Sequence, residues 1–393
     1  MFKHLIKLIW NKKKQNALLI TEIFFSFLVI FAVFTLAVYA FRNYKKPKGI
    51  DYENVWVINY TNSLETKNID SLTQFYELFK KNLKSMPEII EASYTSPNTP
   101  FASYTITGAM YYNKNQVKAH YFSVDEDYQK TLNIKLLTGR WYNRQDMVSD
   151  KKVIVINKAF KENAFGEEEA VGKFLVDNDG GNKTEIIGVL DDVKFKSNYE
   201  SSASSLYTQY DSSEYKSLNR VLIKVSPHAD AAFENRLYKT VSNSLKNANV
   251  EIEHLPNKLI SANKFMLVPL IILSIVAGFL IVNVALGLFG VLWYNINKRR
   301  GEIGLRKAVG ATNGSVSAQL VFESLILATF SLILGSFFAV QFPLLNVFDL
   351  PSAVYVIALI LAIIFIYLLV LICSLYPGRQ AAGVYPAIAL HED

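Results

Sequence analysis

The best candidate for a nucleotide site is the stretch from Gly166 to Phe174, in which a lysine follows the second of two glycines. A phosphate-binding loop has four residues between its glycines and a serine or threonine that binds magnesium, whereas this stretch has five residues and Phe174. The histidines show no spacing typical of metal ligands, and neither a Gly-x-Ser-x-Gly nor a His-Glu-x-x-His motif is present. The sequence therefore predicts no catalytic, cofactor or metal site and a protein that is not an enzyme.

A second kind of chemistry, the docking of a charged helix on a partner, is suggested by Lys298–Gly310. This segment carries five cationic residues and one acid between two long apolar runs. Ile303 and Val309 would give a helix here a partly apolar ridge, and Glu302 could pair with Arg306 one turn away. Gly310 could close this helix and Thr312 or Asn313 could cap the next one. An ordinary charged loop between spans is the alternative interpretation.

Four apolar runs position that segment. Each has the roughly 20 residues that a membrane span needs; they cover about Ala17–Phe41, Met266–Tyr294, Val316–Val340 and Ala353–Leu375. The first run exceeds the roughly 7–15 residues of a signal-peptide core, which favours an uncleaved anchor over a cleaved signal. Before it, Phe2, Leu5, Ile6 and Ile9 recur at helical spacing among lysines, which predicts an amphipathic helix on membrane lipid.

The positive charge is confined to particular segments. The net charge is +7, yet residues 42–265 hold 30 of the 41 Lys and Arg and 28 of the 34 Asp and Glu. The remaining cations lie near the N-terminus, in Lys298–Lys307 and at Arg379. This bias predicts that both termini are cytoplasmic and that residues 42–264 and 341–352 are outside. It argues against a nucleic-acid partner. The single cysteine, Cys373, lies in the last run, so no disulfide is expected.

The polar insert between the first two runs has the pattern of a mixed α and β domain, with room for two subdomains. Alternating or β-branched runs predict strands at Val55–Tyr60, Tyr104–Tyr111, Val153–Asn157, Thr184–Leu190, Arg220–Ser226 and Val250–Leu255. Helical spacing predicts helices at Asp70–Met86, Lys158–Phe165 and from an Asp230 cap to Lys246. The Ser- and Tyr-rich stretch Ser197–Ser217 lacks apolar periodicity and is expected to be a loop.

The spans contain few polar groups of the kind that line a translocation path. Glu323 is the one carboxylate well inside the later spans, with Gln319 one turn before it and Asn283 in the second span, while Glu22 lies near the inner end of the first. Small residues at four-residue spacing let helices approach closely; they are Ser324, Ala328, Ser331 and Gly335, with Ser274/Gly278 and Ala358/Ala362. The spans are therefore expected to pack on one another.

Two signatures resemble a known family. Lys298–Gly310 with Gln319–Leu327 is similar to the core signature of FtsX/MacB-type ABC transporter permeases, and Tyr376–Leu390 is similar to its closing motif. The positions that match the core signature are Arg299, Arg300, Glu302, Ile303, Gly304, Arg306, Lys307, Ala308, Gly310, Ala311 and Glu323. The insert resembles the MacB-like periplasmic core domain at Val124-Asp125, Leu136–Trp141, Val153–Asn157, Phe165-Gly166, Val171–Lys173 and Ile186–Asp192.

The resemblance implies a membrane protein with an α-helical four-span transmembrane domain and an α+β extracytoplasmic domain inserted between spans 1 and 2. The implied boundaries are a cytoplasmic amphipathic helix (1–16), spans at 17–41, 266–295, 316–340 and 353–375, a core domain (42–265), a coupling helix (296–315), an external loop (341–352) and a cytoplasmic tail (376–393). The residues expected to couple to an ATPase are Arg299, Arg300, Glu302, Ile303, Arg306, Lys307, Val309 and Gly310.

The resemblance also implies a function and partners. The chain would be a non-catalytic permease subunit in the bacterial inner membrane, and a separate ABC ATPase with ATP and magnesium would move its extracytoplasmic domain for export, efflux or lipoprotein release. A second permease copy, identical or related, completes the membrane unit, and the family allows a periplasmic adaptor and an outer-membrane channel. The alternative is a transmembrane regulatory subunit that controls a cell-wall hydrolase or a sensor.

Overall fold

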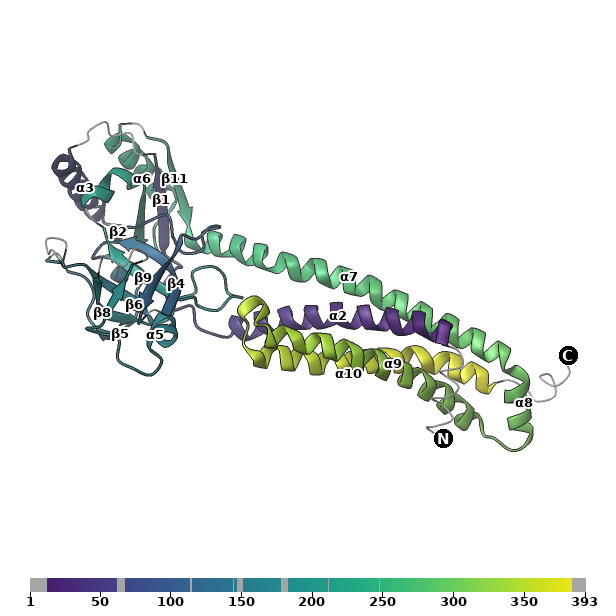
Figure 1. Cartoon of the computed structure of the whole chain (residues 1–393). Helices are drawn as coiled ribbons and strands as arrows, with labels where there is room; N and C mark the ends of the chain where they lie inside the picture. Colours follow the sequence, from purple (N-terminus) through teal and green to yellow (C-terminus); the bar gives the residue numbers. More distant parts are fainter. Residues whose placement is uncertain are drawn as a thin grey trace. The chain divides into compact units, whose positions relative to one another are not determined.

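The computed structural model describes residues 13–61, 68–113, 115–143, 145–146, 151–177, 183–210, 212–246 and 248–383. These residues form two units (Figure 1). One contains the described residues up to Arg42 and from Leu267 onward, and the other is Asn43–Met266. The predicted amphipathic helix around Phe2–Ile9 and the end of the closing motif, from residue 384, lie outside the described residues.

The first unit is built from long apolar helices. They are α2 (Lys13–Tyr44), α7 (Leu255–Lys298), α9 (Asn313–Leu344) and α10 (Ser352–Ala382), with the short α8 (Arg300–Ala308) between α7 and α9 and a 3-10 turn, η2 (Val347–Asp349), before α10. All four long helices have the length and the apolar composition to cross a membrane. Each contains one of the predicted runs, so the predicted four-span fold class is confirmed.

Small side chains set the contacts among α2, α9 and α10. The predicted stripe on α9 is buried, and the Ser331 hydroxyl donates a hydrogen bond to the Ile20 carbonyl of α2 at 3.1 Å. The Phe27 ring lies against Gly335, where an added Cβ would be 2.4 Å from a ring carbon. On α10, Ala358 and Ala362 are fully buried. Here the small residues let neighbouring helices approach, as expected.

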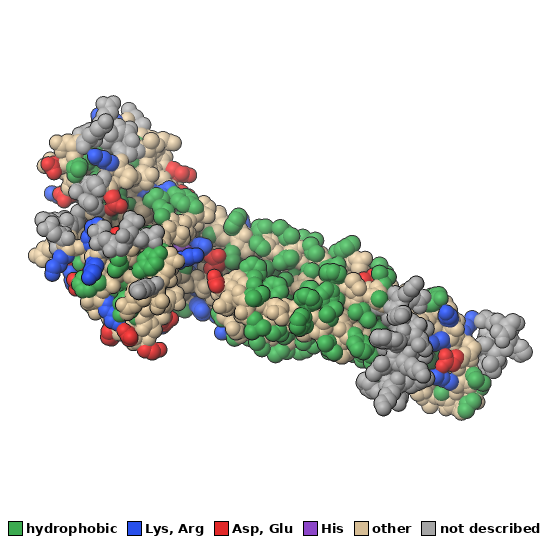
Figure 2. All heavy atoms as spheres, in the orientation of Figure 1, with side chains coloured by type: hydrophobic (Ala, Val, Ile, Leu, Met, Phe, Trp, Pro, Cys, Tyr) green, Lys and Arg blue, Asp and Glu red, His purple; other side chains and the backbone are tan. Residues whose placement is uncertain are grey.

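On α7 the small residues make no such contact within the described part of the chain. Ser274 and Gly278 lie on a face that no other described residue covers, and their neighbours Ile275 and Phe279 are 68% and 69% exposed. A four-residue spacing of small side chains is compatible with lipid or a partner as well as with an intrachain contact, so spacing alone could not decide. Figure 2 shows hydrophobic side chains over much of the visible surface of the four long helices, with charged side chains gathered near α8.

The second unit contains two sheets. The four-stranded sheet has the order β11-β1-β10-β2, with every neighbouring pair antiparallel. Its strands are β1 (Val55–Tyr60), β2 (Ile89–Tyr94), β10 (Arg220–Val225) and β11 (Val250–His254). It shares one hydrophobic core with α3 (Ile69–Lys84) and α6 (Ala231–Ser244), which contribute side chains such as Phe79 and Phe233. Asp230 caps α6 as predicted, since its carboxylate accepts a hydrogen bond from the Phe233 amide at 2.8 Å.

The seven-stranded sheet has the order β5-β8-β6-β9-β4-β3-β7, and an additional β8–β7 pairing closes six of its strands into a ring. Its strands are β3 (Thr107–Tyr112), β4 (Asn115–Val124), β5 (Leu136–Gly139), β6 (Val153–Asn157), β7 (Phe174–Val176), β8 (Lys183–Leu190) and β9 (Ser205–Gln209). The short helices α4 (Tyr128–Thr131) and α5 (Lys158–Phe165) pack against it. With two sheets and their helices, the predicted α+β insert is confirmed.

The prediction of a loop over Ser197–Ser217 is wrong. This stretch contains β9, which lies between β6 and β4, and the 3-10 turn η1 (Ser212–Ser217). The residues Ser205, Leu206 and Tyr207 are all buried, so β9 does not alternate between apolar and polar positions. An internal strand that is covered on both faces loses the period-2 pattern on which sequence recognition depends.

The contact between Phe27 and Gly335 makes a prediction for the membrane unit. Gly335→Ala should destabilise it by about 1–3 kcal/mol, because the new methyl group overlaps the Phe27 ring. Gly278→Ala is the matched control, since a Cβ at that position meets nothing within 4 Å. Thermal unfolding in detergent, followed by circular dichroism, should show a loss only for Gly335→Ala and a partial recovery when Phe27→Leu is added. Equal unfolding temperatures for both single variants would contradict the packing.

Candidate functional site

The first candidate site is the helix α8 with its connection to α9. Gly310 has φ +105°, a conformation that favours glycine, and it lies in the turn between the two helices. Thr312 then caps α9, as the sequence predicted as one of two options, because its hydroxyl oxygen accepts a hydrogen bond from the Ser315 amide at 3.2 Å. The turn directs α8 away from the line of α9 and leaves one side of α8 exposed.

A continuous chain of polar contacts fixes α8 to α9. Arg299 bonds Glu323 at 3.1 Å, and both side chains are largely buried. The Gln319 amide donates to the same Glu323 carboxylate at 3.2 Å and accepts from Arg306 at 2.7 Å. Arg306 completes the chain with the predicted i,i+4 pair to Glu302 at 2.6 Å. Arg306 of α8 and Arg299, which directly precedes α8, are thus held by side chains of α9 or of α8 itself.

Apolar residues divide between the two sides of α8. Ile303, which the sequence analysis placed on the outward ridge, is only 7% exposed and packs against Ile296, Val316 and Leu320. This part of the prediction is therefore wrong, since the helix uses Ile303 to attach to its own chain. The outward apolar residues are Leu305, 56% exposed, and the predicted Val309, 82% exposed. Arg300 and Lys307 are partly exposed, and Gly310 is exposed.

A second cluster lies where the chain leaves α2 and enters α7. The Lys194 side chain is buried, and its ammonium group donates hydrogen bonds to three carbonyls: those of Asn43, of Lys46 at 2.8 Å and of Asn198 at 3.3 Å. Burial, together with the nearby charges of Lys46 and Lys48, lowers the pKa of Lys194 to about 8. No carboxylate among the described residues pairs with this ammonium, so backbone dipoles alone stabilise its charge.

Further contacts extend this cluster to the start of α7. Asn43 donates a hydrogen bond to the Tyr199 carbonyl at 3.3 Å, and Tyr44 stacks on the Tyr199 ring. The backbone amide of Asn198 donates a hydrogen bond to the side-chain oxygen of Asn263 at 2.9 Å. We call these residues (Asn43, Tyr44, Lys46, Lys194, Asn198, Tyr199 and Asn263) the α2–α7 junction. It connects the end of α2, the segment after β8 and the first turns of α7 through hydrogen bonds.

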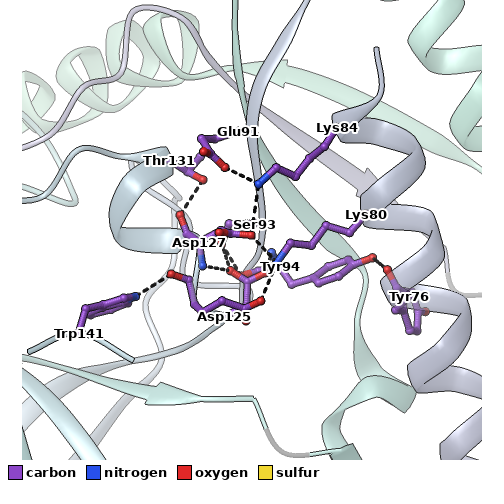
Figure 3. Close-up of polar contacts among 11 residues, drawn as sticks. Tyr76, Lys80, Lys84, Glu91, Ser93, Tyr94, Asp125, Asp127, Thr131 and Trp141 are labelled. Atoms are coloured by element: carbon purple, nitrogen blue, oxygen red, sulfur yellow. Dashed lines mark hydrogen bonds and ion pairs between the residues drawn. The ribbon is translucent and has the colours of Figure 1, made fainter. Parts of the chain in front are cut away.

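The third cluster joins the two sheets of the second unit (Figure 3). Lys80 on α3 lies 2.9 Å from Asp125, 3.5 Å from Glu126 and 2.8 Å from Asp127, in the segment between β4 and α4. Asp125 is buried and also accepts hydrogen bonds from the Ser93 hydroxyl at 2.6 Å and the Tyr94 amide at 2.8 Å. The cluster therefore attaches α3 and β2 of the four-stranded sheet to the end of β4.

Its charges support each other. Burial disfavours the ammonium of Lys80, but the three neighbouring carboxylates outweigh burial and raise the pKa of Lys80. For Asp127, burial alone would raise the pKa. The hydrogen bond from Lys80 and the nearby lysine charges outweigh burial and lower the pKa of Asp127. Trp141 closes the cluster, as its indole donates to the Glu126 carbonyl at 3.0 Å. Each contact serves another member of the cluster, which indicates a structural role.

In the stretch that was rejected as a nucleotide site, the lysine side chain contacts other residues of the second unit. Lys173 forms an ion pair with Glu168 and lies 5.4 Å from the centre of the Tyr112 ring. Within the described residues, no three His, Cys, Asp or Glu side chains are grouped as metal ligands.

Comparisons with known proteins give a consistent picture. The family model of the MacB-like periplasmic core domain matches residues 18–238, and that of the FtsX-like permease C-terminal region matches residues 274–386. The macrolide export ATP-binding/permease protein MacB of Neisseria meningitidis is 22% identical over 319 residues, which are 78% of this chain and 48% of the relative. The chain thus spans about half the length of this relative.

Other relatives have more similar lengths. The uncharacterized ABC transporter permease YvrN of Bacillus subtilis is 22% identical over 296 residues, 69% of this chain and 70% of YvrN. Among solved structures, the periplasmic region of MacB from Actinobacillus actinomycetemcomitans is similar to 55% of this chain, with 95% of that region covered, 16% identity and a TM-score of 0.38.

The Lys80 cluster predicts a large effect of one substitution. Lys80→Met should lower the free energy of unfolding by about 3 kcal/mol, because it leaves Asp125 buried without its cation. Lys84→Met is the comparison; Lys84 pairs with Glu91 and lies 3.6 Å from Asp127, but it is more exposed than Lys80 and should contribute less than about 1 kcal/mol. Urea unfolding of the full chain in nanodiscs, with tryptophan fluorescence as the signal, measures both.

Acid gives a second readout of this cluster. The folded pKa of Asp127 lies below its unfolded value, so its contribution to stability is present above the ordinary range near about 4 and is lost as the pH falls through the folded pKa. Lys80→Met should weaken this loss more than Lys84→Met does, because Lys80 lies 2.8 Å from Asp127 and Lys84 lies 3.6 Å away. Similar stability of both lysine variants across this range would contradict the assignment.

Proposed function

Because the chain belongs to the family of ABC transporter permeases with a MacB-like periplasmic core domain and an FtsX-like C-terminal region, we propose that it is a permease subunit driven by a separate ATPase. ATP and magnesium are bound by that partner, and this chain supplies the membrane helices and the domain that moves. The transport reaction belongs to the export, efflux or lipoprotein-release type.

The observation that carries this proposal is the construction of α8. A helix that transmits force needs an exposed surface for the partner and a firm attachment to its own chain. Leu305 and Val309 supply exposed apolar anchors, and the contacts of Arg299 and Arg306 with α9 supply the attachment. The cations around the anchors suit an acidic groove, which would orient the docking partner. A simple solvated loop would need neither feature.

The α2–α7 junction is the proposed output of the motion. A displacement at the end of α2 or the start of α7 acts directly on Asn43 and Asn263. The hydrogen bonds of Asn43 and Asn263 would carry this displacement to Lys194 and to the segment after β8. The strand β8 belongs to the seven-stranded sheet. The extracytoplasmic domain would thus respond to the ATPase without cargo passing between the spans.

The remaining assignments follow from this proposal. The four long helices would lie in the bacterial inner membrane with α8 and both termini in the cytoplasm, as the charge bias predicts. A second permease copy, identical or related, would complete the membrane unit, and an adaptor with an outer-membrane channel would extend the path in an efflux system. With these assignments, the ATPase would act on the cytoplasmic side of the membrane and the cargo would be handled on the opposite side.

The exposed anchors of α8 provide the test of function. Leu305→Ser and Val309→Ser should each lower the affinity for the partner ATPase, and the ATP turnover of the complex, on the order of tenfold, as the loss of a central interface anchor does. Leu345→Ser is the matched control, because Leu345 is 70% exposed but lies at the other end of α9. Co-purification and ATPase rates measure both quantities. If the α8 variants retain the parent's ATPase, α8 is not the docking site.

Lys194 provides the test of transmission. Lys194→Met should leave ATP turnover by the complex within about twofold of the parent but abolish the ATP-dependent change in hydrogen exchange in β8 and Ser197–Tyr199. Lys194→Arg should also fail, because a planar guanidinium group cannot replace a point charge that three carbonyls surround. Lys135→Met, at an exposed lysine, is the control. A retained exchange response in Lys194→Met would show that motion reaches the sheet by another route.

A further inference from the structure

The second unit contains a cavity that none of the three clusters explains. Its volume is about 980 Å³, which is near the upper end of the roughly 300–1,000 Å³ typical of small-molecule sites. Its walls come from the segment after β2, the strand β4, the segment after β8, α6, β11 and the first turns of α7. All of its lining residues belong to the unit Asn43–Met266.

One part of the wall is apolar. It includes Phe101, Ile252, Ala262 and Met266, while the side chains of Ser103, Thr105 and Ser261 add hydroxyl groups. Phe101 is almost fully buried, so it forms a fixed floor. A ligand that covers this wall must have an apolar body with some polar edges.

The charged side chains of the wall differ in how many hydrogen bonds and ion pairs they form. The Lys258 ammonium is 2.6 Å from Glu253, which also accepts a hydrogen bond from Asn59 at 2.7 Å, so these charges are committed to each other. Glu234 contacts only the imidazole of His254, at 3.2 Å, and that ring is stacked on Trp56. Neither lysine nor arginine forms an ion pair with Glu234 within the described part of the chain.

Glu200 is the least satisfied group. It is partly buried, and it makes no hydrogen bond and no ion pair with any described residue. Burial raises the pKa of Glu200, and the charge of Lys196 only partly offsets this. Burial and Lys196 also lower the pKa of His120 to about 4, so this imidazole is neutral at pH 7. A carboxylate that is partly removed from water without a partner is stabilised when a ligand brings a positive charge.

We propose that this cavity binds an amphipathic organic cation, whose apolar body covers Phe101, Ala262 and Met266 and whose protonated nitrogen is held by Glu200 and Glu234. At neutral pH the cavity has these two carboxylates and Lys196, besides the Glu253–Lys258 pair, which leaves it with a net negative charge. The His120 imidazole adds a neutral hydrogen-bonding group. An anionic ligand would be repelled by both carboxylates, and a purely apolar one would bring no positive charge to Glu200.

The position of the cavity suggests how occupancy is sensed. Lys196, Ser197 and Glu200 lie in the same segment as Lys194, and Ser261 and Ala262 directly precede Asn263. The walls are therefore continuous with the α2–α7 junction. This inference deepens the proposed function, because it names the class of molecule that the moving domain would meet. Binding to the cavity itself needs no ATPase.

Two dyes with the same ring system test the proposal. Rhodamine 123 is a cation, and rhodamine 110, which has a free carboxylate instead of an ester, is a net-neutral zwitterion. The full chain in lipid nanodiscs should bind rhodamine 123 on the order of tenfold more tightly than rhodamine 110 in a fluorescence polarisation titration, because the free carboxylate of rhodamine 110 would be repelled by Glu200 and Glu234. Empty nanodiscs correct for dye that enters lipid.

Variants assign the binding to the carboxylates. Glu200→Gln and Glu234→Gln should each weaken rhodamine 123 binding on the order of tenfold and reduce its preference over rhodamine 110, whose carboxylate is then repelled less. Glu251→Gln, at an exposed glutamate of β11 outside the cavity lining, is the control and should bind as the parent does. Unchanged unfolding temperatures show that the variants are folded, and Ala262→Trp, which fills the cavity, should abolish binding independently of charge.

The outcomes separate this inference from the proposed function. Equal binding of both dyes, or rhodamine 123 binding that is insensitive to Glu200→Gln, Glu234→Gln and Ala262→Trp, would overturn the inference. ATPase co-purification that depends on Leu305 and Val309 would then still support the permease function. Selective dye binding in a chain that recruits no ATPase would instead retain the site and remove the proposed coupling.

Discussion

A charged side chain between two membrane helices must be neutralised where it lies, because unpaired charge in hydrocarbon is costly. In this protein the constraint acts at Glu323, and the structure meets it with Arg299 from the start of α8. This contact also determines the direction of α8, since Arg306 and Gln319 extend it along the helix and Ile303 fills the space beneath. The apolar residues that remain, Leu305 and Val309, are thereby left facing outward. The requirement to neutralise Glu323 and the exposed surface proposed for docking thus have a common physical origin.

In the second unit, two buried lysines have their charges stabilised in different ways. Lys80 is neutralised by carboxylates from another sheet, so its ion pairs hold the two subdomains together. Lys194 is instead surrounded by carbonyl groups, which stabilise its charge less completely, and burial lowers its pKa. The first arrangement favours a rigid connection. The second is easier to disturb, because small changes of carbonyl direction alter the stabilisation of a buried ammonium group, and it lies where the chain passes from α2 to the domain.

Much of the fold could be predicted from the sequence, because the four spans and the strands Val55–Tyr60 and Val153–Asn157 have strong periodic or uniform patterns. The strand β9 could not, since burial on both faces removed its alternation. Within the site, the Glu302–Arg306 pair followed from helical spacing, but the burial of Ile303 depends on Val316 and Leu320 of the next helix. Lys194 gave no signal at all, because its partners are backbone carbonyls, which every residue carries whatever its side chain.

The helix α7 contributes residues to each of the sites that the proposed mechanism connects. Its first turns contribute Asn263 to the α2–α7 junction and Ala262 to the cavity, and its last turn contributes Ile296 to the packing beneath α8. In the proposed mechanism, a rotation or tilt imposed near Ile296 acts along this hydrogen-bonded helix. Pro269, which removes one amide donor, is the point inside α7 where such a load would first bend the helix. It lies close in sequence to the cavity wall, so bending there would act on the end of the helix that carries Ala262 and Met266.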